Sequence, residues 1–403
     1  MSLLPVADAL KRVLAKAQPL PSEHVALAEA HQRVLAEDLR ALRTQPPADV
    51  SAMDGYAVRA EDFATTPTEL KLIGEVAAGR PFAGTLQTGE TVRIFTGGEL
   101  PAGADTVVVQ EQTQRDGDTV TFATRPQPGR HIRKAGLDFR DNDILLARGR
   151  VLSDRDLSLA AAMNHPQVPV HRKPRTALLA TGDELVLPGQ TPGPGQIIYS
   201  NGYSIMSLAR QQGAEVIDLG IVPDRIEDTI AAIRRARDAK VDVLVTLGGA
   251  SVGDYDLVQK ALTSEGIDLS FWKIAMRPGR PLMHGQLGDM QVLGLPGNPV
   301  SAYVCAFLFL GPLLRQLCGR QDIENPTEQA LLGSDLPEND ERADYLRARL
   351  SRSVRGVAVA TPFPLQDSSM GRVLAHSDCL VLREPHAERA LTGSICTILK
   401  LPL

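Results

Sequence analysis

The sequence predicts a multidomain α/β protein, in which a doubly wound α/β domain is accompanied by an inserted β-rich subdomain and a C-terminal β domain. Residues 173–312 repeat an apolar strand, a Gly-rich polar turn and an amphipathic helix, which is typical of a doubly wound domain. Residues 51–146 instead contain short apolar runs between Gly and Pro turns, which predicts an all-β subdomain. At 403 residues the chain is too long for one hydrophobic core, so about two to four domains are expected.

Changes in these patterns divide the chain into four expected parts. A discontinuous N-terminal helical and linking domain comprises residues 1–50 and 146–172. The β-rich subdomain, residues 51–145, is inserted between these two segments. Residues 173–322 then form the α/β domain, and residues 323–403 form the C-terminal β domain.

The N-terminal half is expected to combine one clear helix with several short strands. Helical spacing of apolar residues predicts a helix over 5–17, which Pro19 and Pro21 stop. The segment 24–36 is expected to be a short strand followed by a helix, and 43–49 is expected to be an extended linker. The expected strands of the β-rich subdomain include residues 70–73, 90–94, 106–109 and 119–122.

The C-terminal half alternates strands with helices before it ends in strands alone. A helix should follow Val151, with Asp154 near its cap. Within the α/β domain, strands are expected at 175–180, 216–219, 241–247 and 292–295. The expected helices cover residues 201–212, 225–239, 256–263 and the segment after Pro299. The C-terminal β domain should contain strands at 345–350, 357–361, 379–383 and 395–399.

Composition indicates a soluble, cytoplasmic protein. A net charge of −5 does not favour non-specific binding to nucleic acid. The longest apolar stretch, 300–314, is interrupted and too short to span a membrane, and the N-terminus lacks the features of a signal peptide. The four cysteines show no metal-ligand spacing, and a disulfide framework is not expected.

Two loops that follow strands of the α/β domain combine glycines with carboxylates. Glu184 follows the strand at 175–180, and Asp256 ends the loop 248–256, in which Ser251 can donate to a phosphate. Because the carboxyl ends of parallel strands converge in one crevice, these loops are expected to meet. Their glycines can expose backbone N–H groups to an anion, and their carboxylates suit Mg²⁺. A polar surface loop and ordinary helix-capping acids are the alternative interpretations.

A cationic cluster follows at Lys273, Arg277 and Arg280. Arg recognises anions with two parallel hydrogen bonds, so the cluster predicts an anion-binding turn, with a solvated basic face as the alternative. The turn 295–301 is expected to shape the same pocket, with Ser301 in contact with ligand. Together these loops predict a site for an anionic, phosphate-bearing ligand held with a metal. The sequence contains neither a P-loop nor a GxGxxG motif, which counts against ordinary kinase and dehydrogenase functions.

Five motifs in order along the chain then identify a family. They are Ser-Ala-Met-Asp-Gly-Tyr-Ala (51–57), Arg-Ile-Phe-Thr-Gly (93–97) followed by Pro-Ala-Gly-Ala-Asp (101–105), Thr-Gly-Asp-Glu-Leu (181–185), Gly-Gly-Ala-Ser-Val-Gly-Asp-Tyr-Asp (248–256) and Gly-Leu-Pro-Gly-Asn-Pro-Val-Ser (294–301). With these motifs, the chain resembles the molybdopterin molybdotransferases, the family of bacterial MoeA and the E domain of gephyrin. The resemblance covers essentially the whole chain.

The resemblance implies an α/β domain of the molybdopterin-binding type within an elongated subunit. It implies a homodimer whose site is shared between subunits, and insertion of molybdate into adenylylated molybdopterin with Mg²⁺-dependent release of AMP, giving molybdenum cofactor. The preceding molybdopterin adenylyltransferase is a further expected partner, whereas nucleic acid and membrane are not. Two alternatives remain open: an adenylyltransferase-like nucleotide enzyme, and a gephyrin-like scaffold.

The family's functional positions carry over to specific residues of this chain. The expected catalytic residues are Asp54, Glu184, Asp256 and Lys273. The expected substrate-binding residues are Thr96, Arg133, Asp138, Ser251, Arg277, Arg280, Ser301 and Ser368. The expected metal ligands are Glu184, Asp224 and Asp256. The family often has Lys where Arg277 and Arg280 stand, which keeps the charge but changes the hydrogen-bond geometry. The segment 367–369 also lacks a Gly that the family often has there.

Overall fold

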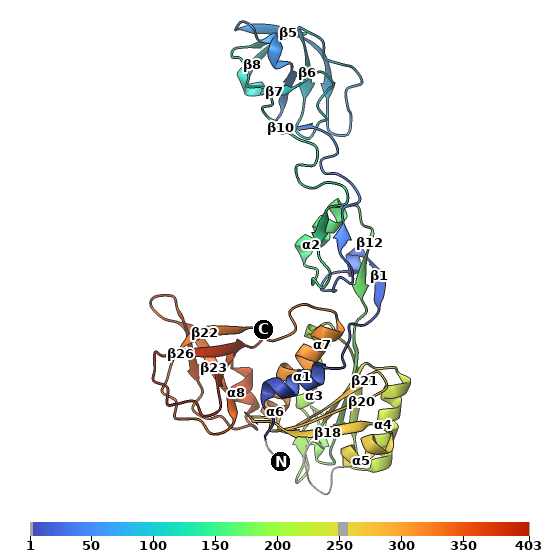
Figure 1. Cartoon of the computed structure of the whole chain (residues 1–403), viewed down its shortest axis with the longest axis vertical. Coiled ribbons are helices and arrows are strands. Elements are labelled where there is room, and N and C mark those ends of the chain that lie inside the picture. Colours follow the sequence, from blue (N-terminus) through green and yellow to red (C-terminus); the bar gives the residue numbers. More distant parts are fainter. Residues whose placement is uncertain (1–2, 249–256, 403) are drawn as a thin grey trace.

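The computed structural model describes residues 3–248 and 257–402 and shows an elongated molecule (Figure 1). The β-rich subdomain lies at one end, and the α/β and C-terminal domains lie side by side at the other. A narrow linking domain joins the two ends, and the chain passes through it twice. The residues expected to form one site are therefore divided between the two ends of the molecule.

The N-terminal segment contributes to both the α/β domain and the linking domain. Helix α1 (Val6–Leu14) buries Ala9 and Val13 in the core of the α/β domain, which confirms the first predicted helix. In the linking domain, strand β1 (Ser22–Ala26) pairs antiparallel with β12 (Gln167–His171). Helix α2 (Asp154–Ala162) packs beside this pair, and its N-terminus is closed by a reciprocal capping box between Ser153 and Asp156.

The prediction of a helix within 24–36 is wrong. Only a single 3₁₀ turn, η1 (Leu27–Glu29), follows β1. The chain then runs extended, because Val34 forms a β-bridge with Val151 and Leu35 forms one with Val170. Tertiary pairing therefore overrides the helical spacing of apolar residues in this segment.

The β-rich subdomain contains a six-stranded sheet in the order β7-β4-β6-β5-β9-β8. Its strands are β4 (Gly55–Val58), β5 (Thr68–Val76), β6 (Glu90–Ile94), β7 (Thr106–Val109), β8 (Thr113–Asp116) and β9 (Thr119–Phe122), with 3₁₀ turns η2 (Ala60–Asp62) and η3 (Gln110–Gln112). The four predicted strands are confirmed. Two short pairs connect the subdomain to the linking domain: β3 (Val50–Ser51) with β10 (Ile132–Arg133), and β2 (Leu39–Arg40) with β11 (Ile144–Leu146).

The α/β domain contains a second six-stranded sheet in the order β16-β13-β17-β21-β20-β18. Four strands are parallel: β13 (Arg175–Thr181), β16 (Glu215–Val222), β17 (Val243–Leu247) and β21 (Met290–Leu295). Helix α3 (Asn201–Gln211) packs in one core with α6 (Pro299–Cys305) and α7 (Gly311–Leu317), whereas α4 (Ile226–Asp238) and α5 (Leu257–Ser264) pack in another. Helices thus cover both faces, and the predicted doubly wound architecture is confirmed.

Two features of this domain differ from the expectation. An antiparallel pair at the sheet edge, β18 (Asp268–Lys273) with β20 (Pro281–Leu287), was not predicted. The apolar stretch after Pro299 is also longer than expected, since α6, the π-helical segment η4 (Ala306–Leu310) and α7 form one helix of 19 residues. This helix is long and apolar enough to cross a membrane, but 89% of its most apolar window is buried inside the structure, as in a core helix.

The C-terminal domain is a third six-stranded sheet, ordered β19-β23-β24-β22-β26-β25 and closed by pairing of β23 with β25. Its own strands are β22 (Thr327–Leu332), β23 (Ala343–Arg352), β24 (Ala358–Pro362), β25 (Cys379–Arg383) and β26 (Ile395–Lys400), with a short helix α8 (Gly371–Ala375). Strand β19 (Met276–Arg277) comes from the α/β domain and pairs with β23. The four predicted strands are confirmed, and β19 joins the two domains.

Candidate active site at the carboxyl edge of the sheet

The loops singled out in the α/β domain lie along one edge of its sheet. Since β16, β13, β17 and β21 are parallel and adjacent, their carboxyl ends share an edge. Strand β18 ends at this edge and β20 begins there, because Lys273 pairs with Pro281. This edge therefore carries Glu184, Asp224, Lys273, Arg280 and the turn 295–301, with Asp224 and Lys273 at the two ends of the strand order. Ser251 and Asp256 lie outside the described residues.

The loops after β13 and β17 pack tightly against each other. Gly248 has φ +89°, and its backbone N–H donates to the Leu295 carbonyl over 3.3 Å. A Cβ on Gly248 would lie 3.2 Å from the Thr181 carbonyl oxygen. At Gly182, with φ +150°, a Cβ would lie 2.5 Å from Oε2 of Glu184. Glycine at 182 thus allows the Glu184 carboxylate to fold back over the end of the strand.

Acidic side chains gather where β13 and β16 end. The backbone N–H of Asp224 donates to Oδ1 of Asp183 over 3.2 Å, and the Gly182 N–H donates to the Val222 carbonyl. Asp183, Glu184 and Asp224 are exposed to solvent. Within the ranges that the structure describes, no group of three His, Cys, Asp or Glu side chains is close enough to hold a metal by itself. These acids supply the hard oxygen donors that Mg²⁺ prefers, and further ligands would come from substrate and water.

The cationic cluster divides into two roles. Arg277 forms a bidentate salt bridge with Asp344 of the C-terminal domain, with Nε–Oδ1 and Nη2–Oδ2 distances of 2.7 and 2.8 Å. This hydrogen bond raises the pKa of the Arg277 guanidinium. Lys273 is half-buried and Arg280 is exposed, and neither has a salt-bridge partner among the described residues. The charge of Arg277 is thus already neutralised, whereas those of Lys273 and Arg280 are not compensated by a salt bridge in the described residues.

The turn 277–281 lies on the first turns of α6. Gly279 has φ +100°, and a Cβ there would lie 2.5 Å from Sγ of Cys305. The Cys305 thiol donates to the Gly279 carbonyl over 3.4 Å, and burial raises its pKa to about 12. Ser301 is buried beneath the same turn, with 5% of its surface exposed. Ser301 therefore supports the cationic turn from below, and Cys305 is a neutral packing residue.

The C-terminal domain places Ser368 at the same edge. Asn298 donates from Nδ2 to Oγ of Ser368 over 3.0 Å, and the Val300 N–H donates to the Ser368 carbonyl over 3.1 Å. Asn201 donates from Nδ2 to the Gly297 carbonyl over 2.6 Å. A pocket of about 360 Å³ opens beside these contacts, lined by residues that include Ser200, Asn201, Pro299, Tyr303 and Gly371. Asn201 and Asn298 were not predicted as site residues. Asn201 is the first residue of α3, and Asn298 lies directly before α6, so a helix start was the available signal.

The remaining predicted site residues lie in the β-rich subdomain. Thr96 donates its backbone N–H and its hydroxyl to Oδ1 of Asp54, each over 2.7 Å, and these bonds lower the pKa of the Asp54 carboxyl. Arg93 stacks over the Tyr56 ring beside them, with its guanidinium carbon 5.0 Å from the ring centroid. Arg133 and Asp138 are exposed where the subdomain joins its linker.

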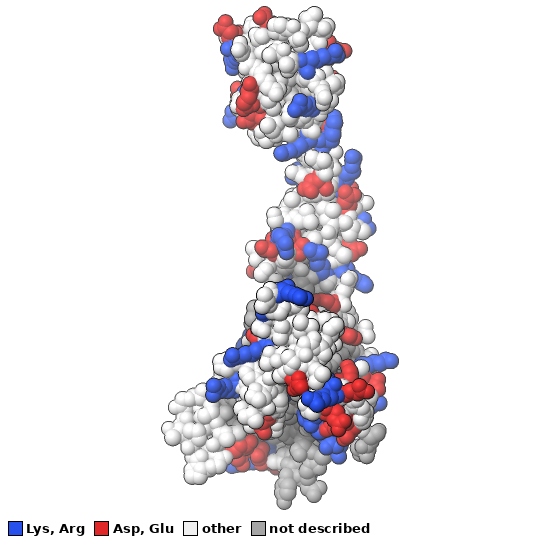
Figure 2. Space-filling model, turned by 90° about the vertical axis from the view of Figure 1, so that its left-hand side faces the viewer, with Lys and Arg blue, Asp and Glu red and all other residues white. Residues whose placement is uncertain are grey.

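The two groups of residues do not meet within one chain. Figure 1 shows the subdomain at the end of the molecule opposite the α/β domain, whose helix α5 and strand β18 lie farthest from it. In Figure 2 the same separation is visible, and Lys and Arg side chains gather at the base of the subdomain. The predicted site residues of the β-rich subdomain and those of the α/β domain thus lie at opposite ends of the chain.

Comparison with known proteins matches the chain along most of its length. Residues 4–164 match the MoeA N-terminal region (domains I and II), residues 177–316 match a probable molybdopterin binding domain, and residues 329–401 match the MoeA C-terminal region (domain IV). A molybdopterin molybdenumtransferase of Haemophilus influenzae is 34% identical and covers 94% of each chain. One from Nostoc is 40% identical over 74% of this chain and 70% of its own.

A solved structure shows the same arrangement. The crystal structure of a molybdopterin biosynthesis MoeA protein from Pyrococcus horikosii is 30% identical, covers 99% of both chains and superposes with a TM-score of 0.87. Such agreement over nearly the full length supports the multidomain fold as well as the individual domains. The chain belongs to the MoeA family of molybdopterin molybdenumtransferases.

Proposed function

We propose that this chain inserts molybdate into adenylylated molybdopterin, with Mg²⁺-dependent release of AMP, to give molybdenum cofactor. The observation that supports this best is the carboxyl edge of the α/β sheet, which carries Glu184 and Asp224 on the loops after β13 and β16, and Lys273 and Arg280 beside β18 and β20. Molybdate and the pyrophosphate linkage are both anionic, so cations must gather them, and carboxylates alone would repel them. Carboxylates and cations at one edge suit a phosphate-bearing substrate held with a divalent cation.

The acids at this edge would hold the metal. Glu184 and Asp224 fit Mg²⁺ by donor chemistry, and we assign Asp256 to the same set from its place in the sequence. When bound, Mg²⁺ would neutralise negative charge on the phosphate at which AMP leaves. The absence of a side chain at Gly182 leaves room for the Glu184 carboxylate beside the strand end.

The cations would bind the substrate's oxygens. Lys273 and Arg280 collect molybdate and phosphate, since both are uncompensated by salt bridges in the described structure. Arg277 holds the C-terminal domain through Asp344 and so fixes the turn that presents Arg280. We propose that Ser251 and Ser368 donate hydrogen bonds to the substrate and that Ser301 shapes the pocket floor.

The second half of the site would come from a partner copy. Asp54, held by Thr96, would orient the oxygen that attacks phosphorus, and Arg133 and Asp138 would line the approach to it. Because these residues lie at the far end of their own chain (Figure 1), we propose a homodimer whose site lies between one chain's subdomain and the other's α/β domain. Transient docking of the preceding adenylyltransferase would deliver the substrate. Four free cysteines without a disulfide suit the reducing cytoplasm.

Release of AMP tests this function. Purified protein should release AMP from adenylylated molybdopterin only when molybdate and Mg²⁺ are both present. An adenylyltransferase would instead consume ATP and molybdopterin, and a scaffold would do neither. AMP release that is independent of molybdate would contradict the proposal.

A further inference from the structure

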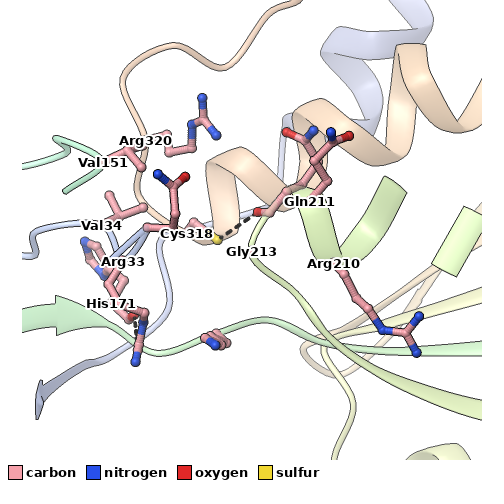
Figure 3. Close-up of a pocket in the computed structure, with 12 residues that line it drawn as sticks. Arg33, Val34, Val151, His171, Arg210, Gln211, Gly213, Cys318 and Arg320 are labelled. Carbon is pink, nitrogen blue, oxygen red and sulfur yellow. Dashed lines mark hydrogen bonds between the residues drawn. The ribbon is translucent and has the colours of Figure 1, made fainter. Parts of the chain in front are cut away.

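A second concentration of positive charge lies at the junction between the linking domain and the α/β domain, away from the carboxyl edge. A cavity of about 280 Å³ opens there (Figure 3). Its walls come from both domains: residues 32–34, 151 and 171 on one side, and residues 173, 210–213, 318 and 320 on the other. Of the described residues that line it, four are Arg or Lys and none is Asp or Glu.

One buried thiol, Cys318, shares the cavity lining with these cations. Burial raises the pKa of Cys318 to about 11, while the charges of Arg320, Arg33 and Lys173 act in the opposite direction and that of Asp242 acts with burial. In Figure 3, Arg33 and Arg320 lie on the same side of the cavity as Cys318, whereas the guanidinium of Arg210 extends away from them.

Two of the cations that line the cavity are paired with carboxylates that do not line it. Arg33 pairs with Glu23, whose side chain is 47% exposed, and Arg320 pairs with Asp322, whose side chain is 66% exposed. Lys173 is exposed and has no salt-bridge partner in the part of the chain that the structure describes. Asp242, the remaining nearby acid, is engaged by both guanidinium nitrogens of Arg172 over 2.7 Å. Arg320 donates from Nε and Nη2 to both oxygens of Asp322, so among the described residues Lys173 and Arg210 are the lining cations without a salt-bridge partner.

We propose that this cavity binds a small multivalent oxyanion, such as inorganic phosphate or the phosphate end of a nucleotide. Its size suits such an anion better than a whole nucleotide, since pockets for drug-sized ligands are about 300–1,000 Å³. Because Arg33 belongs to the linking domain while Lys173 and Arg320 belong to the α/β side, the anion would tie the two together. It would thereby stiffen the joint from which the distant β-rich subdomain projects.

Titration calorimetry with inorganic phosphate tests the proposal in the full-length protein. The background should be Lys273→Ala/Arg280→Ala, so that anions bound at the carboxyl edge do not contribute heat. Lys173→Ala should then weaken phosphate binding by about tenfold, as expected for loss of one charge-assisted hydrogen bond. Arg210→Ala also removes one positive charge from the cavity wall. It should leave phosphate binding unchanged, because the Arg210 guanidinium extends away from the other cations. Lys173 and Arg210 are both exposed, so neither variant threatens the fold.

A gain of affinity provides the sharper test. Glu23→Gln releases Arg33 from its ion pair and should tighten phosphate binding several-fold. AMP should bind about as tightly as phosphate if the phosphate end alone is recognised, and more tightly if the base also contributes. Equal losses in Lys173→Ala and Arg210→Ala, or no tightening in Glu23→Gln, would show general attraction to a basic surface and overturn the proposal.

Discussion

Thr96 donates two hydrogen bonds of 2.7 Å, from its backbone N–H and its hydroxyl, to the same oxygen of Asp54. The two residues are separated by 42 positions and lie on different loops of the β-rich subdomain. Both bonds favour the ionised carboxylate, and they lower the pKa of Asp54. Asp54 is thus held as an oriented anion, as a residue that positions an attacking oxygen requires.

Thr96→Val removes the hydroxyl bond while it keeps the backbone bond. The pKa of Asp54 should rise towards its ordinary value, because one of the two bonds that favour the charged form is lost. The acid limb of the kcat/KM profile for AMP release should therefore move to higher pH. Thr119→Val, which changes an exposed threonine of the same subdomain, is the control and should leave the profile unchanged. An unmoved acid limb in Thr96→Val would contradict this role of Asp54.

Glu184→Gln should reduce AMP release at least about tenfold and raise the Mg²⁺ concentration needed for half-maximal activity, since one hard oxygen ligand is lost. The melting temperature should stay nearly constant because the side chain is exposed. Glu215→Gln changes an exposed glutamate at the amino end of the same sheet and should have no effect on activity. Unchanged Mg²⁺ dependence in Glu184→Gln would remove Glu184 from the metal site.

Gly182→Ala tests the same carboxylate through the backbone. The new Cβ would lie 2.5 Å from Oε2 of Glu184, and φ +150° is unfavourable for alanine. We expect the Glu184 side chain to be displaced, with a loss of activity close to that of Glu184→Gln. In the double variant Gly182→Ala/Glu184→Gln the two losses should not add, as expected for residues that act through one contact. Additive losses would mean that Gly182 acts separately from Glu184.

Arg277→Ala and Arg280→Ala should separate the two roles in the cationic cluster. Loss of Arg277 leaves Asp344, whose side chain is only 12% exposed, without its bidentate partner. We expect a loss of about 1–3 kcal/mol in the free energy of unfolding, measured by urea denaturation. Arg280→Ala should leave stability unchanged and raise the molybdate concentration needed for half-maximal activity. If Arg280→Ala lost stability and Arg277→Ala raised the molybdate requirement instead, Arg280 would be the interdomain anchor and Arg277 the anion-binding residue.

Acid should remove the stabilisation that Asp340 gives within the C-terminal domain through its hydrogen bond with Arg342. Hydrogen bonding by Arg342 lowers the pKa of Asp340 to about 2, from an ordinary value of 3.8. Because the folded-state pKa is depressed, the stabilisation is complete above about pH 4 and is lost as pH falls towards 2. Asp340→Asn should thus be less stable than the unmodified chain at pH 7, by up to about 1 kcal/mol after solvent screening. The difference in stability between Asp340→Asn and the unmodified chain should become small towards pH 2. A difference that stays constant with pH would contradict the lowered pKa of Asp340.

Local patterns predicted much of the fold. The expected strands at 90–94, 106–109, 119–122 and 379–383 are observed with the same bounds, because each lies between clear turn residues. Strand β22 was missed because Thr327, Glu328 and Gln329 are exposed, so the segment looks like a polar linker. Such a strand is defined by its partners β24 and β26, which a local pattern does not reveal.

The composition of the candidate site was predictable, but its pairings were not. A Gly-rich turn after an apolar strand placed Glu184 at the carboxyl edge, because parallel strands end together, whereas strand β18, which ends at Lys273, was not predicted. The salt bridge of Arg277 with Asp344 joins residues 67 positions apart, and the bond between Asn298 and Ser368 spans 70. Both depend on how the C-terminal domain docks. The free cation expected at Arg277 therefore could not be distinguished from an interdomain anchor by sequence alone.

Activity in mixed dimers tests most directly whether the site combines two chains. Asp54→Ala and Lys273→Ala homodimers should each be nearly inactive in AMP release. In mixed dimers one site contains both defects and the other contains neither, so random mixing should restore on the order of a quarter of the unmodified activity. Recovery at that level is the result we predict. No recovery, in dimers that mass spectrometry shows to be mixed, would mean that each site forms within one chain.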